Sequence, residues 1–495
     1  MLTYTLQPNQ KVPLYEQLTR CIKEDISGGV LSPGEKLPGK RSLARNLGIS
    51  VVTVETAYQQ LLAEGYITSE ARRGFFVADI RSFFPDAPGQ VYDRLSHGKG
   101  RKSGKVNKSV SGNKQITEKG TPESSIIDSR KYLADFSANE TSRENFPFTT
   151  WAKLSREELS EESSRLVKSS PGNGIPELRE AIARHLWSFR GLNCNPENIV
   201  VGAGTEYLYS LLIQLLGFHK VYGIEDPGYR KLSRIYQSYG VNLLHIPLDR
   251  FGEGASALSE TGADILHISP SHHFPTGRVM PIRERNEVLK WAAEQEGRYI
   301  IEDDYDSEFR LVGRPIPALF KADPFGRVIY MNTFTKTLAS TVRISYMVLP
   351  DGLMEQLNER LSFYSCTVSN FEQYTLTRFI MSGYFERHLN RMRNFYRTKR
   401  DRVIRILNES PLAQVMRIRE EDAGLHFLLE LSMSLSDAEF VRKASEKGVR
   451  ISPLSAYYHN RENAPEHVFI VNYSSLSEEA LPKAAEILAE IILKK

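Results

Sequence analysis

Beyond residue 131, the hydrophobic pattern alternates between short apolar runs and longer amphipathic stretches. The amphipathic stretches have the period of a helix, as in residues 283–294. The apolar runs are continuous, which is typical of strands buried on both faces of a parallel sheet. We therefore expect an α/β domain with a mostly parallel central sheet, whose ligands bind beyond the carboxyl ends of the strands. The expected strands are residues 199–201, 220–224, 265–268, 299–301 and 328–331.

The N-terminal part of the chain has a different pattern, in which three short helical segments precede two strand-like runs. Residues 14–26 carry an apolar side chain at every fourth position, which predicts a supporting helix. A second helix ends at Gly48, and Ser50 caps a third helix by accepting backbone N–H bonds. The strand-like runs, residues 65–68 and 73–77, flank a charged tip and are interpreted as a wing. This order predicts a small α+β winged helix-turn-helix domain.

The third helix of this domain predicts contact with DNA. Its first turn offers the positive end of the helix dipole to a phosphate, and Thr53 is left on an outward face. A small helical bundle with a hairpin that binds no nucleic acid has the same spacing, and the balanced charge of the segment keeps that alternative open. The whole chain has 64 Lys and Arg residues against 60 Asp and Glu residues, a net charge of +4. This excess is too small to mark the whole surface as a polyanion binder, so nucleic-acid contact must be local.

Residues 81–131 have the composition of a flexible basic linker. They are rich in Gly, Ser and Asn, with too few apolar side chains to offset the entropy of ordering. Between residues 94 and 119, eight Lys or Arg residues stand against one acid, Glu118. A solvated spacer accounts for this composition, while its charge would add salt-sensitive attraction to DNA phosphates. We therefore expect a DNA-binding domain (1–80), a linker (81–131) and a larger α/β domain (132–495).

The overall composition is that of an ordinary globular protein, with 495 residues and 41% hydrophobic content. Cys21, Cys194 and Cys366 are far apart and without paired spacing, which argues against a disulfide framework or a zinc knuckle. His272 and His273 lack the spacing of a metal site, so we expect them to pack or form hydrogen bonds. The N-terminus has no signal-peptide pattern and the apolar runs are too short to span a bilayer, so we expect a cytoplasmic protein without a membrane partner.

Carboxylates follow the expected strand at residues 299–301, in the run Glu302-Asp303-Asp304-Tyr305. They therefore lie where a parallel strand leaves its sheet. A carboxylate that faces a pyridine nitrogen keeps it protonated and makes the ring an electron sink. We assign Asp303 to this role. A helix cap and a metal site are the alternatives for the same acidic cluster.

A lysine with phosphate-binding neighbours follows another expected strand. Lys336 ends the run Thr333-Phe334-Thr335-Lys336, and Arg343 lies seven residues further on. Burial lowers the pKa of a lysine enough for it to form a Schiff base with an aldehyde, while hydroxyls and an arginine suit a phosphate. The glycine-rich turn at residues 202–205 offers free N–H groups to the same phosphate. A lone lysine is usually surface charge, but this set predicts a site for pyridoxal 5'-phosphate (PLP).

Residues 11–79 resemble the winged helix-turn-helix of the GntR family. The shared motifs are Leu37-Pro38, Leu43-Ala44, Leu47-Gly48-Ile49-Ser50, Thr53-Val54 and Glu64-Gly65-Tyr66. The resemblance implies that Arg41, Ser50 and Thr53 meet DNA in or beside the major groove. It also implies that Arg73 and Gly74 place the tip of the wing near the minor groove.

The rest of the chain resembles fold-type I PLP enzymes of the aspartate aminotransferase kind, which add a smaller C-terminal subdomain to the main sheet. The motifs that carry this resemblance are residues 171–179, 225–229, 270–277 and 423–426. The fusion with a GntR-type domain resembles the MocR, or GabR-like, regulators, which join the two parts through a variable linker. It implies a homodimer that binds paired half-sites in double-stranded promoter DNA.

The same resemblance implies a role for each residue of the cofactor site. Lys336 would hold PLP as an internal aldimine, and Asp303 would face the pyridine nitrogen. Tyr305 would donate a hydrogen bond to the phenolic oxygen of the ring, and Tyr229 would stack on the ring. The phosphate would be surrounded by Gly204, Thr205, Thr333, Thr335 and Arg343.

Several positions depart from these family patterns. Val51 and Val52 stand where many GntR relatives have Arg and then a polar residue, which removes a donor to a base or phosphate. Phe274 stands where many aminotransferases have Asn, a choice that MocR proteins share. Ile470 stands where classical enzymes have the arginine that clamps the substrate carboxylate, and Arg450 is an alternative clamp that the sequence does not place. We therefore expect little or no physiological transaminase turnover.

The leading hypothesis is a PLP-dependent transcriptional regulator that senses PLP, an amino acid or another amine through aldimine chemistry at Lys336. Exchange of the lysine for an amine would change the charge and packing of the pocket, and so bias how the dimer presents its DNA-binding domains. The first alternative is a functional aminotransferase with an accessory DNA-binding domain. The second is a repressor whose pocket is an empty relic, although the lysine, aspartate, tyrosine and arginine are all retained.

Overall fold

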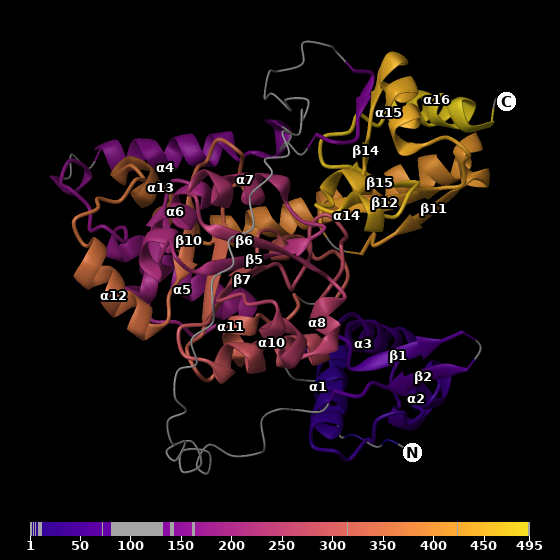
Figure 1. Ribbon diagram of the computed structural model, residues 1–495, viewed down its shortest axis with the longest axis horizontal. Helices are drawn as coiled ribbons and strands as arrows, with labels where there is room; N and C mark the ends of the chain where they lie inside the picture. Colours follow the sequence, from indigo (N-terminus) through magenta and orange to yellow (C-terminus); the bar gives the residue numbers. More distant parts are fainter. Residues whose placement is uncertain are drawn as a thin grey trace, which may run out of the picture. The chain divides into compact units, whose positions relative to one another are not determined.

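The computed structural model describes the chain on both sides of the expected linker (Figure 1). The described residues are 2, 4, 6–7, 12–71, 73–80, 132–138, 143–160, 164–313, 315–422 and 424–493. The expected linker lies outside them, so its flexibility and the domain boundaries stay predictions.

Three helices and a two-stranded hairpin form the N-terminal domain. Gly48 ends the second helix in the left-handed region at φ 66°. The Ser50 hydroxyl caps the third helix by accepting a hydrogen bond of 3.0 Å from the Thr53 N–H. The expected apolar stripes meet in one core, in which Leu18, Ile22, Val54, Tyr58 and Leu61 are fully buried. The winged helix-turn-helix is thus confirmed; its elements are α1 (Leu14–Ser27), α2 (Lys40–Leu47), α3 (Val51–Ala63), β1 (Ile67–Glu70) and β2 (Gly74–Val77).

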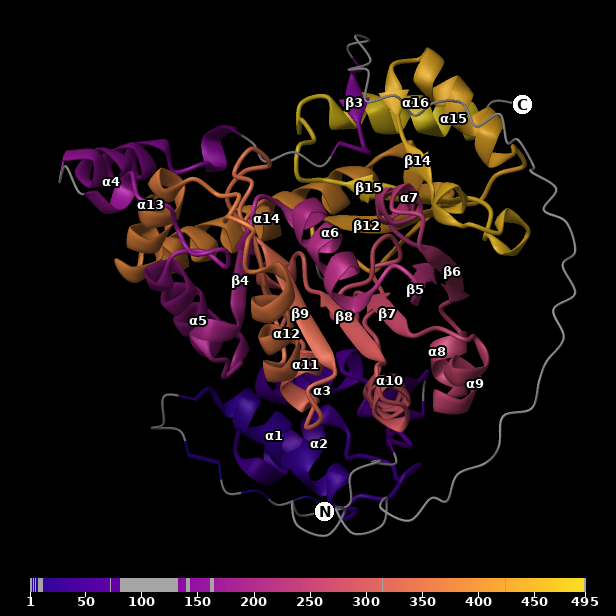
Figure 2. The same cartoon turned by 60° about the vertical axis from the view of Figure 1, so that its left-hand side comes forward.

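A seven-stranded sheet lies at the centre of the second described part (Figure 2). Its order is β4-β10-β9-β8-β7-β5-β6, and the neighbouring strands are parallel except where β10 pairs with β4 and β9. The expected runs correspond to β4, β5, β7, β8 and β9, while β6 and β10 are additional. The bounds are β4 (Ile199–Gly202), β5 (Val221–Asp226), β6 (Asn242–Pro247), β7 (Ile265–Ile268), β8 (Tyr299–Asp303), β9 (Val328–Thr333) and β10 (Ser345–Val348).

Helices cover both faces of this sheet, as the continuous apolar strands predict. Consecutive strand residues point to opposite faces, so Val200 and Val201 belong to different cores. One face packs against α6 (Thr205–Leu216), α7 (Arg230–Ser238) and α12 (Asp351–Leu361). The other packs against α5 (Pro176–Arg190), α10 (Ile282–Glu294), α11 (Leu319–Ala322) and α13 (Asn370–Met381). This part also contains α4 (Phe148–Ser160), α8 (Arg250–Glu253) and α9 (Ala255–Glu260).

A smaller antiparallel sheet, of order β11-β12-β15-β14, forms a C-terminal subdomain. Phe427 and Val471 on one face join the core beneath α14 (Tyr384–Glu409), α15 (Asp437–Glu446) and α16 (Leu481–Leu493). Leu428 and Ile470 on the other face belong to a separate apolar cluster. These two sheets with their helices confirm the expected fold-type I architecture. The strands are β11 (Met416–Arg419), β12 (His426–Leu431), β14 (Ser452–Pro453) and β15 (Val468–Asn472), beside a two-stranded pair of β3 (Ala134–Asp135) and β13 (Val449–Arg450).

Among the described residues, no helix combines the length and the apolar character needed to cross a bilayer.

Candidate cofactor-binding site

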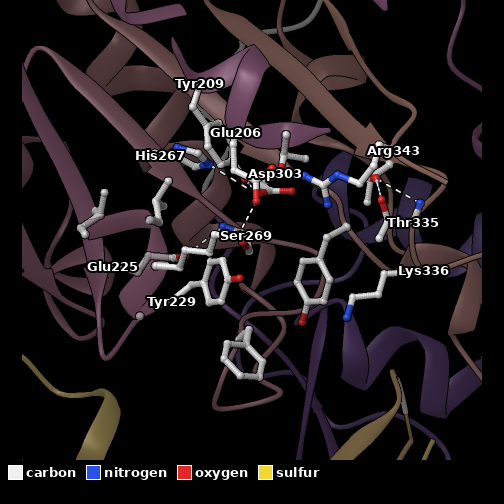
Figure 3. A pocket seen from close by; sticks show the side chains of 18 residues that line it. Glu206, Tyr209, Glu225, Tyr229, His267, Ser269, Asp303, Thr335, Lys336 and Arg343 are labelled. Atoms are coloured by element: carbon white, nitrogen blue, oxygen red, sulfur yellow. Dashed lines mark hydrogen bonds and ion pairs between the residues drawn. The ribbon is translucent and has the colours of Figure 1, made fainter. Parts of the chain in front are cut away.

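A cavity of about 250 Å³ lies beyond the carboxyl ends of the central strands (Figure 3). Its walls come from the ends of β5, β7, β8 and β9 and from the first turns of α6 and α7. This is the place where a mostly parallel sheet binds its ligands. The predicted residues that line the cavity are Thr205, Tyr229, Asp303, Tyr305, Thr333, Thr335, Lys336 and Arg343.

Asp303 lines the cavity, whereas the carboxylates on either side of it point away. Glu302 accepts hydrogen bonds of 2.8 and 2.9 Å from the two N–H groups at the start of α11. Asp304 forms a buried ion pair of 2.8 Å with Arg190. This alternation follows from the strand, in which successive side chains point to opposite faces. The helix-cap alternative therefore describes Glu302, and Asp303 remains available to a ligand.

Two residues that the sequence analysis missed hold Asp303 in place. The Tyr209 hydroxyl donates a hydrogen bond of 2.8 Å to Asp303 Oδ2, and His267 Nε2 lies 3.6 Å from the same oxygen. Asp303 Oδ1 is buried and has no hydrogen-bond partner among the described residues. A buried acceptor without a donor is uncommon in folded proteins. The protonated pyridine nitrogen of PLP supplies such a donor, so this end of the cavity fits the cofactor ring.

Lys336 lies three residues beyond the end of β9 and makes no hydrogen bond or ion pair with the described residues. Burial lowers the pKa of Lys336, and the Asp306 carboxylate partly opposes this shift. A lowered pKa increases the fraction of neutral amine, which is the form that attacks an aldehyde. The covalent role of Lys336 stays a prediction.

The predicted phosphate residues form a polar cradle at one end of the cavity. Ser345 Oγ and Thr333 Oγ1 lie 2.8 Å apart, and Thr333 Oγ1 lies at the same distance from Thr335 Oγ1. Gly204 has φ 89°, and a Cβ there would collide with the Arg343 guanidinium. The guanidinium therefore lies against the glycine backbone at the start of α6, where unpaired N–H groups favour an anion.

Tyr305 is held by a buried histidine and carboxylate pair. Its hydroxyl lies 3.2 Å from His272 Nδ1, which in turn lies 2.8 Å from Asp306 Oδ2. Burial, together with nearby carboxylates, raises the pKa of the Tyr305 phenol well above its usual value, which keeps it a hydrogen-bond donor. His273 Nδ1 lies 2.7 Å from Thr276 Oγ1. Both histidines thus form hydrogen bonds, and the described residues contain no group of His, Cys, Asp or Glu side chains that suits a metal.

The cavity wall also contains apolar side chains, among them Phe274. Ile470, at the sequence position of the classical carboxylate clamp, is buried with Leu428, Leu454 and Val468 and is not among the residues that line the cavity. The Phe274 ring contacts the Tyr457 ring at a centroid distance of 5.3 Å. The lining residues that carry a Lys or Arg charge, within the described part of the chain, are Lys231, Lys336 and Arg343.

Arg450 does not replace the clamp. It lies on β13, half-exposed, and its guanidinium is 3.5 Å from an Asp135 carboxylate oxygen. It is absent from the described walls of the cavity. An amino-acid carboxylate would therefore find no guanidinium at the clamp position within the described chain.

The residues predicted to contact DNA lie on α2, on α3 and on the hairpin of the N-terminal domain. Arg41 is exposed near the start of α2, and Thr53 is partly buried in the first turn of α3. Ser50 uses its hydroxyl for the helix cap described above. Arg73 is exposed at the tip of the hairpin, where it forms an ion pair with Glu70, and the adjacent Gly74 has φ 111°. These positions are accessible, and their contacts with DNA stay predictions.

Comparison with known proteins assigns both parts of the chain. The model of bacterial regulatory proteins of the gntR family matches residues 14–77, and that of aminotransferase class I and II matches residues 132–488. The chain is 32% identical to the probable rhizopine catabolism regulatory protein MocR of Rhizobium meliloti, over 99% of this chain and 95% of that protein. The chain belongs to the MocR family of transcriptional regulators. Members of the aminotransferase class I and II family depend on PLP, and the donor set described above fits that cofactor.

Other relatives in this family span almost the whole chain. An uncharacterized HTH-type transcriptional regulator of Bacillus subtilis, YdeL, is 37% identical over 96% of each chain. The pyridoxine biosynthesis regulator PdxR of Corynebacterium glutamicum is 30% identical over 92% of this chain and 91% of its own. The multiple substrate aminotransferase of Thermococcus profundus has the same fold, with a TM-score of 0.64 and 24% identity over 74% of this chain and 93% of that one.

Proposed function

We propose that this transcriptional regulator senses PLP, or an amine that competes for it, through Lys336. The observation that carries the proposal is the cavity itself. Within the described part of the chain, it combines a lysine without a partner, an Asp303 oxygen without a donor and an arginine beside a helix start in one cavity. Bound PLP supplies an aldehyde that bonds reversibly to a lysine amine and a protonated ring that draws electrons.

Each group of the chain has a defined task in this proposal. Asp303, fixed by Tyr209 and His267, holds the proton on the ring nitrogen. Arg343, together with the nearby threonine hydroxyls, binds the phosphate. Tyr305, positioned by His272, donates a hydrogen bond to the phenolic oxygen. In this proposal the protein senses whether PLP occupies the site.

The residue at the clamp position favours PLP itself as the effector over an amino acid. Recognition of an amino-acid carboxylate typically uses a bidentate arginine, and Ile470 occupies that position here. The relative PdxR carries the name of a pyridoxine biosynthesis regulator, which agrees with a vitamin B6 effector. The functional aminotransferase remains the second candidate because the lysine, aspartate and tyrosine of the site are all in place.

We also propose that the protein acts as a homodimer, whose partner covers an exposed apolar surface. Large side chains are exposed on α4, on α13 and on the loops beside them, including Val167 at 82% and Phe363 at 76%. Exposed apolar groups gathered in this way usually mark an interface. A Phe363→Asp variant is expected to lower the mass measured by light scattering from two chains to one, and an unchanged dimer would contradict this assignment.

The visible absorption spectrum with added PLP tests the cofactor assignment. The full-length protein is expected to show the band of lysine-bound PLP, and Lys336→Ala is expected to lose it. Lys290→Ala, on α10, is a matched control that should keep the band. A band that persists in Lys336→Ala, or one missing from the parent, would contradict the proposal.

A further inference from the structure

A carboxylate lies in the phosphate cradle of the cavity and bonds to its arginine. Glu206 is the residue after Thr205 in the first turn of α6, and it lines the cavity. Its Oε2 forms an ion pair with the Arg343 guanidinium, while its Oε1 forms an ion pair with Lys231. Figure 3 labels Glu206 and Arg343 in the cavity wall. One carboxylate thus joins the cation predicted to bind phosphate to a second cation.

The Arg343 guanidinium lies close to the backbone at the start of α6. The guanidinium lies against Gly204, where a side chain would displace it. Carboxylates and phosphates both bind a guanidinium through the same planar fork of N–H donors. A phosphate that reaches Arg343 must therefore share this fork with Glu206 or displace the carboxylate from it.

The negative charge of Glu206 opposes the binding of a phosphate at Arg343. The ion pairs with Lys231 and Arg343 lower the pKa of the Glu206 carboxyl against the opposing effect of burial, so it is ionised near neutral pH. A phosphate monoester carries a charge of about −1.5 to −2 at pH 7. Two anions at one guanidinium repel each other, and Lys231 offers Glu206 a partner when the phosphate takes Arg343.

We propose that Glu206 is an internal competitor for Arg343 that weakens the binding of phosphate-bearing ligands and so keeps PLP exchangeable. An aminotransferase works best when its cofactor stays bound, whereas a protein that senses the concentration of PLP must be able to release it. Lys231, which already pairs with Glu206 Oε1, keeps the carboxylate paired when a phosphate displaces Oε2 from Arg343. This inference rests on the proposed function for the identity of PLP, but the competition itself concerns any phosphate.

Titrations of the full-length protein with three ligands test the competition. Glu206→Gln keeps the shape of the side chain and removes its charge, and it is expected to bind both PLP and inorganic phosphate roughly three- to tenfold more tightly. Pyridoxal, which lacks the phosphate, should bind parent and variant equally. Glu355→Gln, an exposed change of the same charge on α12, is the matched control and should alter none of the three.

Lys231→Gln tests the second half of the mechanism. It leaves Glu206 with Arg343 alone, so phosphate and PLP should bind several-fold more weakly. In the Glu206→Gln background the same substitution should have a smaller effect, because no carboxylate remains to be redirected. Equal effects in both backgrounds would mean that Lys231 acts only through its own charge and would overturn its role.

The outcomes separate this inference from the proposed function. Equal or weaker phosphate binding by Glu206→Gln overturns the inference, even when PLP still bonds to Lys336. Tighter phosphate binding by Glu206→Gln in a protein that never shows the lysine-bound PLP band supports the inference and refutes the proposed function. A thermal melt of each variant without ligand shows whether it is folded.

Discussion

Two parts of the cavity wall differ in the chemistry that they offer a ligand. At one end Asp303, Lys336 and Arg343 present a carboxylate, an amine and a guanidinium that suit the ring nitrogen, the aldehyde and the phosphate of PLP. Elsewhere the wall presents apolar side chains such as Phe274, and Ile470, at the sequence position of the arginine that binds the substrate carboxylate in a classical aminotransferase, is buried outside the wall. A site can therefore keep the groups that bind a cofactor and lack those that select an amino acid. Such a site suits detection better than turnover.

Among the changes that test this comparison, removal of Arg343 is expected to have the largest effect, a loss of PLP affinity. Arg343→Ala deletes the charged donor of the cofactor end, and hydrogen bonds to charged groups contribute about 2 kcal/mol, which corresponds to a loss of PLP affinity of roughly 30-fold. Titration by visible absorption measures the loss. Arg450→Ala is the control, since Arg450 lies outside the cavity wall and pairs with Asp135. A similar loss in both variants would contradict the assigned phosphate cradle.

Because Ile470 replaces the clamp arginine, the site should bind ligands with and without a carboxylate about equally well. An amino acid and the amine made by its decarboxylation, such as phenylalanine and phenethylamine, should displace Lys336 from PLP with affinities that differ by less than roughly threefold. A bidentate guanidinium would instead favour the amino acid by about 1 to 3 kcal/mol, which is about 5- to 150-fold. Single-turnover spectroscopy with both compounds makes the comparison. A strong preference for the amino acid, with amino transfer, would favour the aminotransferase alternative.

Glu225, in the cavity wall, is expected to make the stability of the protein depend on pH, which is a smaller effect. Its Oε2 accepts a hydrogen bond of 2.9 Å from the Ser269 N–H, and burial raises its pKa to about 8. Because this folded-state pKa lies above the usual value of 4.5, the contribution of Glu225 to stability is fully present below about pH 4.5 and is lost as the pH rises towards 8.

A Glu225→Gln variant removes this titration. Relative to the variant, the parent should lose about 1 kcal/mol of unfolding free energy for each pH unit between pH 5.5 and 7.5. Urea denaturation of both full-length proteins across this range measures the difference. A difference that is constant with pH would show that Glu225 is already ionised in the folded protein.

Five strands of the central sheet could be predicted from the sequence because both of their faces are buried. The strands β4, β5, β7, β8 and β9 are apolar runs covered on both faces, so their sequences show them directly. The edge strand β6 is half-buried and mixes Asn, His and apolar residues, so it lacks the uninterrupted apolar run by which the other strands were found. β10 is as long as β4, is buried and carries the apolar run Tyr346-Met347-Val348, so the sequence contained a signal for it that was overlooked.

The residues of the site likewise divide into those that local sequence motifs reveal and those that only the tertiary fold brings together. Asp303, Lys336 and Arg343 stand in recognisable local motifs, so the sequence analysis found them. Tyr209 and His267 were missed because their contact with Asp303 depends on how α6 and β7 pack, although Tyr209 lies one helical turn beyond Thr205. Glu206 and Lys231 were missed for a related reason, since their shared ion pairs form only when α6 and α7 meet at the cavity.

The central claim is that PLP bonded to Lys336 changes how the protein binds DNA. The most direct test measures the affinity of the full-length protein for the DNA upstream of its own gene, with and without PLP, at one fixed salt concentration because phosphate contacts depend strongly on salt. PLP should change the affinity of the parent at least about fivefold, the lower limit of typical coupling between two sites. Lys336→Ala should bind the same DNA with no response to PLP. An equal response in Lys336→Ala, or none in a parent that shows the lysine-bound band, would contradict the account.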